Sequence, residues 1–207
     1  MLKKYIFAIL FLLLASAAAR AEMYVGARYG GALSLIYFTP NKNEGMLFSP
    51  INTAVAFRYC NEKAQDYERF MNILMEVGYG ERGYTIGPDS LKTSVTSQAL
   101  EVPFMMQARI PVAKHVHALV TGIVYGAYYL RNGSTEVFPE LKDRVRNYEY
   151  GIGGGLGLCL NFGKMDFALD ARYMASMSYL VEPNIALYES MPMQVVISFS
   201  VMRKIGK

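Results

Sequence analysis

Residues 51–60 read Ile-Asn-Thr-Ala-Val-Ala-Phe-Arg-Tyr-Cys, a run in which larger apolar side chains alternate with small or polar ones. Val55 and Phe57 share one parity, whereas Asn52 and Arg58 share the other. Successive side chains of a strand point to opposite faces, so this period of two predicts a β-strand between two different environments.

The same alternation recurs along the chain. It is found at residues 71–80, 100–109, 148–160, 166–173 and 193–201. Further strands expected near 23–31 and 116–130 bring the count to eight, an even number as closed membrane barrels require. Helical spans are not expected, because no apolar stretch of about 20 residues follows residue 22. We therefore predict an all-β fold, an eight-stranded antiparallel up-and-down transmembrane β-barrel with a polar, side-chain-filled lumen.

The distribution of lysine predicts which face of the barrel meets lipid. Beyond the first four residues the lysines are Lys42, Lys63, Lys92, Lys114, Lys142, Lys164, Lys204 and Lys207, all in expected connections or the tail. A lysine on a lipid-exposed strand face costs roughly 2–4 kcal/mol near the midplane, whereas a water-exposed face carries lysine readily. The apolar face is therefore expected to point at lipid, which argues against the alternative of a soluble ligand-binding barrel.

Aromatic residues are expected to form a girdle at the strand ends. The tyrosines assigned to it are Tyr29, Tyr59, Tyr79, Tyr125, Tyr129, Tyr150 and Tyr173. Within residues 116–130, Gly122 and Gly126 favour the face of Val116, Ala118 and Val120 as the crowded inner one.

The amino terminus has the layout of a cleavable secretory signal. Lys3 and Lys4 precede an apolar run that is too short to span a membrane, and Ala19-Arg20-Ala21 matches an A-x-A cleavage site. We expect residues 1–21 to be removed and residues 22–207 to form one barrel domain. The net charge then falls from +4 to +1, which leaves no electrostatic footprint for nucleic acid.

The expected connections differ in length at the two ends of the barrel. Residues 61–68, 111–115 and 161–164 form the shorter, periplasmic turns, and residues 39–50, 81–95, 131–146 and 181–191 form the longer, outward loops.

Charged residues of the polar face are the candidate site. They are Arg28, Arg58, Glu76, Glu101, Arg109, Glu149, Asp166, Asp170 and Arg172. An eight-stranded barrel has an interior just wide enough for side chains, so these charges should pair across the lumen and leave no diffusion pore. Gly151, Gly153, Gly155 and Gly157 should give the arginines room to cross.

No cofactor or metal site is predicted. The Gly-rich run at 151–157 alternates within a strand and precedes no helix, so it does not fit a phosphate loop. His115 and His117 have no evident third ligand, and no serine can be nominated beside them for a lipid hydrolase. Cys60 and Cys159 fall on opposite strands, so we expect free thiols, a disulfide being the alternative.

Stretches spread over nearly the whole mature chain resemble the PorT-like outer-membrane β-barrel family of Gram-negative bacteria. Ala99–Arg109 is similar to that family's "LEIPLLLKY"-type strand, and residues 150–158 with 167–173 are similar to its later "GGLGL…ELRY" pair. The opening 26–40 is similar too. The resemblance implies an outer-membrane barrel and a link with secretion, and it carries no catalytic residues.

These observations predict a non-enzymatic outer-membrane protein. Its partners would be outer-membrane lipid and a protein contacted through the outer loops or the periplasmic rim. The main alternative is a small porin-like channel for ions or small solutes, and an enzyme acting on lipid is a further one.

Overall fold

Eight strands close into a single ring in the computed structural model, which describes residues 21–39, 43–61, 71–88, 92–137, 143–181 and 189–205. Their bounds are β1 Ala21–Thr39, β2 Gly45–Asn61, β3 Met71–Ile86, β4 Thr93–Ala113, β5 Val116–Arg131, β6 Tyr148–Phe162, β7 Met165–Ser176 and β8 Glu189–Ile205. Each strand pairs antiparallel with the next, and β8 returns to β1 to close the barrel. The predicted fold class is confirmed.

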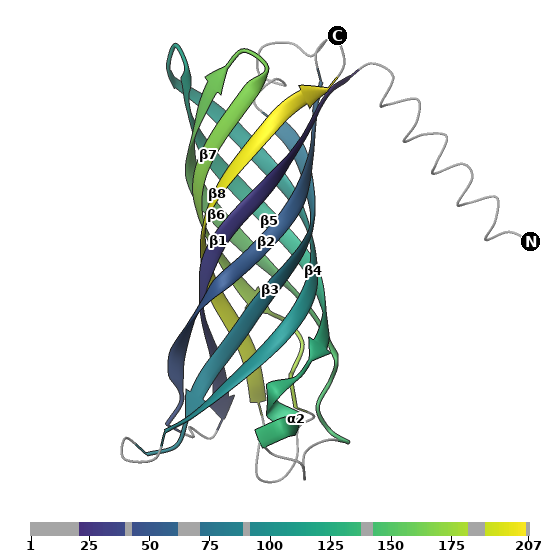
Figure 1. Cartoon of the computed structure of the whole chain (residues 1–207), viewed down its shortest axis with the longest axis vertical. Helices are drawn as coiled ribbons and strands as arrows, with labels where there is room; N and C mark the ends of the chain where they lie inside the picture. The colour runs from purple at the N-terminus through teal and green to yellow at the C-terminus, as the bar shows by residue number, and fades with distance from the viewer. Residues whose placement is uncertain are drawn as a thin grey trace, which may run out of the picture.

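The strands tilt steeply around the barrel axis, and the start of β1 and the end of β8 lie at the same end of it (Figure 1). At that end two of the turns are only two residues long, at 114–115 and 163–164. Gly163 takes a φ of +66° in the second of these, the left-handed conformation that tight hairpins need. The opposite end carries the two longest connections, 132–147 and 177–188, and the short helix α2 Gly133–Val137 lies in the first of them (Figure 1). Because outer-membrane barrels turn tightly at the periplasm, we call the first end periplasmic and the second outer.

The outward face is apolar, and the inward face combines polar and charged side chains with buried apolar ones. Val55, Phe104, Leu156 and Phe199 are among the exposed outward side chains, while Glu76, Asn52 and Asp166 are buried inside. Gly151 and Gly155 leave inward space, since an added Cβ would lie 2.7 Å from the Tyr125 ring and 3.1 Å from Arg172 Cγ. No helix within the described ranges is long and apolar enough to cross a membrane.

The predicted inner face of β5 is wrong. Leu119, Thr121, Ile123, Tyr125, Ala127 and Tyr129 point inward, and Val120 is exposed. A Cβ on Gly122 would meet nothing within 4 Å, so this glycine marks open lipid-facing surface rather than crowding. Tyr125 and Tyr129 therefore do not belong to the girdle.

The other girdle tyrosines agree with the prediction in part. Tyr29, Tyr150 and Tyr173 are exposed on the outside, and Tyr59 and Tyr79 are half-buried. Tyr37, Tyr128 and Tyr148 are exposed as well and were missed.

Several strands are longer than predicted, because backbone hydrogen bonding between neighbouring strands continues beyond the residues that show the apolar alternation. The β3–β4 pair runs out to Ile86 and Thr93, across most of the expected 81–95 loop. Lys92, Lys114 and Lys164 lie in connections as predicted, but Lys204 lies within β8, near its end, where it pairs with Glu22. Lys42, Lys63, Lys142 and Lys207, like residues 1–20 of the expected signal, lie outside the described residues.

Candidate functional site: the closed lumen

The middle of the lumen is occupied by four charged side chains, which we call the central layer. Arg28 donates to Glu76 at 2.8 Å, and Arg172 donates to both oxygens of Glu76 at 2.9 and 3.0 Å. Arg172 also donates to Asp170 at 2.5 Å, and Asn52 accepts from Arg28 at 2.6 Å. Bidentate arginine–carboxylate pairs are the strongest class of hydrogen-bonded ion pair, so this layer joins β1, β3 and β7 through the lumen.

A second layer, which we call the periplasmic layer, lies on the periplasmic side of the central layer and is centred on Asp166. This carboxylate accepts from Arg58 on β2, from Arg109 on β4 at 3.0 Å and from Asn161 at 2.5 Å. Arg58 also lies over the Tyr24 ring, 4.0 Å from its centroid. One carboxylate therefore holds two arginines that come from different strands.

An outer layer is centred on Glu149 and Arg82. Arg82 donates to Glu101 at 3.0 Å and to Glu149 at 2.7 Å. Tyr125 and Tyr129 donate their hydroxyls to Glu149 at 2.6 and 2.5 Å. Buried carboxylates are costly without such partners, and here three donors meet one of them.

All nine charged residues predicted for the lumen lie in these three layers. The prediction missed Arg82, which it had assigned to a loop. A signal for it existed, because Arg82 continues the parity of Glu76, Gly78 and Gly80 on β3. With Arg82 included, the three layers contain five arginines and five carboxylates, so the charge of the described layers balances.

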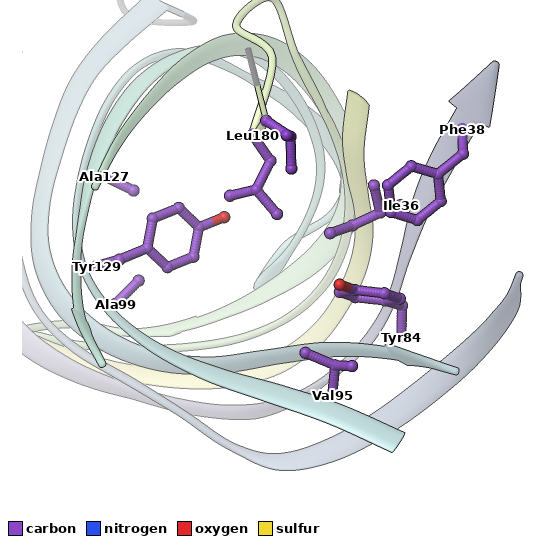
Figure 2. Close-up of a cluster of buried hydrophobic side chains, with 9 residues drawn as sticks. Ile36, Phe38, Tyr84, Val95, Ala99, Ala127, Tyr129 and Leu180 are labelled. Atoms are coloured by element: carbon purple, nitrogen blue, oxygen red, sulfur yellow. The ribbon is translucent and has the colours of Figure 1, made fainter. Parts of the chain in front are cut away.

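An apolar cap lies on the outer side of Glu149 and closes the outer mouth of the barrel. We use "cap" for a buried cluster of nine side chains: Ile36, Phe38, Tyr84, Val95, Ala99, Ala127, Tyr129, Leu180 and Val181. Figure 2 shows Tyr129, Leu180 and Ile36 projecting into the space that the strands enclose. Leu180 and Val181 follow β7 and are held there by backbone bonds from Arg146 N to Leu180 O and from Leu180 N to Ser190 O, at 2.8 and 2.9 Å.

Helix α2 supports the same cap. The hydroxyls of Ser134 and Tyr84 lie 3.0 Å apart, and Phe38 packs edge-on to Tyr84 with ring centroids 5.6 Å apart. A cavity of about 20 Å³ remains between the cap and the outer layer, lined by Glu149, Tyr129 and Gln194 among others. That space holds about one water molecule and is too small for a solute.

The cysteines and histidines lie near the periplasmic end. Cys60 and Cys159 are both free thiols, as predicted, and Arg109 donates to Cys159 Sγ at 3.3 Å. His115 stacks on Phe162 with ring centroids 6.0 Å apart. No group of three or more metal-ligating side chains occurs in the described part of the chain.

The fold and its inverted faces have counterparts among known proteins. The model of a family described as "Outer membrane protein beta-barrel domain" matches residues 20–181. The chain belongs to this family. The barrel is accordingly an outer-membrane protein with transmembrane strands, as its sequence predicted. The family match does not extend to the PorT-like group specifically.

Solved structures of small barrels are similar in fold. Neisserial surface protein A is 13% identical, with 88% of this chain and 97% of that chain covered and a TM-score of 0.50. The outer-membrane protein AlkL, determined by solid-state NMR in DMPC bilayers, is 10% identical, with 91% and 92% covered and a TM-score of 0.53. No curated protein sequence matches the chain. At these identities the likeness concerns the fold alone.

Proposed function

We propose that this protein is a non-enzymatic, non-conducting outer-membrane barrel that acts through the surfaces at its two ends, as an interaction or secretion-associated barrel of the PorT-like kind. The observation that carries the proposal is the filling of the lumen. Three layers of paired charges and an apolar cap lie in series along the axis. A pore would need these charges hydrated instead of paired with one another.

Ion conductance tests the closed lumen. The barrel is added to a planar lipid bilayer at 1 M salt, and its folding is verified beforehand by heat-modifiable gel mobility of the same sample. We expect no discrete conductance steps. Steps that change in size when Arg82 is replaced by Ser, and not when the outward-facing Arg203 is replaced, would overturn the proposal in favour of a small channel.

The second half of the proposal is a protein partner at one end. Thr96 is exposed at the outer end of β4, and Val112 is exposed at its periplasmic end. A photocrosslinker attached to Thr96→Cys or Val112→Cys, in a Cys60→Ser, Cys159→Ser background, reports contacts at either end in intact cells. We expect one of the two positions to give a discrete crosslinked adduct and the other to give none. Adducts from neither position would contradict a protein-binding role.

The absence of enzymatic activity is tested separately. The folded barrel is incubated with phospholipid vesicles and released fatty acid is measured. We expect the same release as from vesicles with the His115→Ala, His117→Ala variant; release that requires either histidine would show a lipid hydrolase.

A further inference from the structure

Four buried nitrogen atoms that meet no hydrogen-bond partner gather at the periplasmic end of the lumen. They are Nε of Arg58, Nδ2 of Asn72, Nε of Arg109 and Nδ1 of His117. Arg58 and Asn72 are only 4% and 3% exposed. A buried N–H group without an acceptor costs free energy, so several of them in one place call for a physical reason.

Two of these nitrogens lie beside Cys60. Asn72 is directly opposite Cys60 across the β2–β3 pair, and Arg58 precedes Cys60 by two residues on the inward face of β2. The Arg58 guanidinium donates to Asp166 through Nη2 and stacks on the Tyr24 ring, 4.0 Å from its centroid. Stacking covers the face of a guanidinium and leaves its N–H edge to meet an acceptor.

The other two nitrogens lie beside Cys159. His117 is directly opposite Cys159 across the β5–β6 pair. Arg109 donates to Cys159 Sγ through Nη2 at 3.3 Å and to Asp166 Oδ2 through Nη1 at 3.0 Å. Arg58 donates to the same oxygen of Asp166, so the two groups of unpaired nitrogens surround one carboxylate.

This part of the lumen is reached from the periplasm. Cys60, Arg109 and His117 face inward and are nevertheless half-buried, so solvent penetrates to their level from the periplasmic mouth. The apolar cap closes the opposite end. Acidic side chains of residues 62–70, which follow β2 at the periplasmic end, lie outside the described residues. The class of ligand is therefore deduced from the unpaired N–H groups and not from a balance of charge.

Donors without acceptors favour a ligand that accepts hydrogen bonds. Arginine Nε and the asparagine amide nitrogen are donors only, and His117 Nδ1 donates in one of its two neutral tautomers. Oxyanions accept at each oxygen, and hydrogen bonds from arginine to a carboxylate or a phosphate are strong because both partners are charged. Asp166 already accepts from the Nη atoms of both arginines, which leaves their Nε atoms for a second anion.

We propose that Arg58, Asn72, Arg109 and His117 form a binding site for a small oxyanion, a phosphate or a carboxylate, that enters the lumen from the periplasm. Its oxygens accept from the Nε atoms of the two arginines and from the Asn72 amide. The site depends neither on a protein partner nor on whether the lumen conducts.

The test titrates inorganic phosphate with the folded barrel in detergent micelles and follows the ³¹P NMR line width at constant ionic strength, set with sodium chloride. We expect saturable broadening with the wild type. The dissociation constant should rise at least about tenfold in Arg109→Gln and in Asn72→Leu, because each variant loses an N–H donor to the anion. The matched control is Arg203→Gln, an exposed arginine at the periplasmic end of β8, which should bind like the wild type.

A second measurement locates the anion. In a Cys159→Ser background, phosphate should slow the labelling of Cys60 by N-ethylmaleimide several-fold, and it should have no effect when Asn72→Leu is added. Acetate is titrated in the same way. Stronger protection by phosphate identifies a phosphate ligand, and stronger protection by acetate identifies a carboxylate ligand; either order supports the site.

Three results would overturn the site. They are no saturable effect of phosphate or acetate, unchanged affinity in both Arg109→Gln and Asn72→Leu, or an equal loss in Arg203→Gln. The first would mean that water alone meets the unpaired donors. Heat-modifiable mobility verifies folding of each variant. If Arg109→Gln fails to fold, Asn72→Leu, which removes no charge, still decides the question.

Discussion

Arg172 on β7 and Glu76 on β3 form a bidentate ion pair through the centre of the barrel, with N–O distances of 2.9 and 3.0 Å. The two strands lie four places apart in a ring of eight, which makes them opposite walls. Glu76 also accepts from Arg28 on β1. A single carboxylate therefore pairs with two arginines and ties three strands together.

Replacing Glu76 by Gln should lower the free energy of unfolding by about 3–5 kcal/mol, because two buried arginines lose their common anion. Urea unfolding in lipid vesicles, followed by tyrosine fluorescence, measures this in a chain without tryptophan. Glu81→Gln on the same strand, at a half-buried outward position, should change it by about 0–0.5 kcal/mol. Equal losses in the two variants would refute the central role of Glu76.

Replacing Tyr129 by Phe should cost about 1–3 kcal/mol, because Glu149 loses one of its three donors inside the lumen. The neighbouring Tyr128 faces outward and is 54% exposed, so Tyr128→Phe should stay within about 0.5 kcal/mol of wild type. The same unfolding assay compares them. A larger loss in Tyr128→Phe would mean that the inner face of β5 is misassigned.

Replacing Leu156 by Arg should cost about 2–4 kcal/mol in a bilayer, because this residue is 66% exposed on the outside near the middle of β6. Thr96→Arg, at the outer end of β4, should cost about 0–1 kcal/mol. Folding yield into vesicles and urea midpoints report both. Similar tolerance at the two positions would show that the outward face meets water.

The two thiols should differ in reactivity. Cys60 is half-buried at the periplasmic end, whereas Cys159 is fully buried. A maleimide should label Cys60 about tenfold faster than Cys159 in the folded barrel, measured by mass spectrometry on the Cys159→Ser and Cys60→Ser variants. Equal rates, or a disulfide in the oxidised wild type, would contradict the separation of the two strands.

Export should depend on the Ala19-Arg20-Ala21 site. The mature protein is expected to begin at Glu22, as read by amino-terminal sequencing. Ala19→Asp should leave a larger precursor because it removes the small residue that signal peptidase requires, whereas Arg20→Ala should be processed normally. Normal processing of Ala19→Asp would place the cut elsewhere, and an unprocessed wild type would rule out a cleaved signal.

The strand count, the closed barrel and the inversion of its faces could all be predicted from the amino-acid sequence. Period-two alternation depends only on the geometry of a strand, and the exclusion of lysine depends only on the cost of charge in lipid. These are local properties of each residue's environment. For the same reason the nine lumen charges could be found by parity, and Arg82 would have been found had the parity of β3 been followed past Gly80.

Which charges meet, and where the chain closes the lumen, could be seen only in the folded barrel. Partners such as Arg58 and Asp166 are 108 residues apart, and their contact depends on strand tilt and stagger, which alternation does not encode. The inner face of β5 could be assigned only from a contact between two strands. Tyr125 and Tyr129 on β5 donate hydrogen bonds to Glu149 on β6, inside the barrel. The cap includes Leu180, which lies outside any strand and folds back into the barrel. Burial of its side chain is favourable only where other strands already enclose an apolar space, so the local sequence does not predict it.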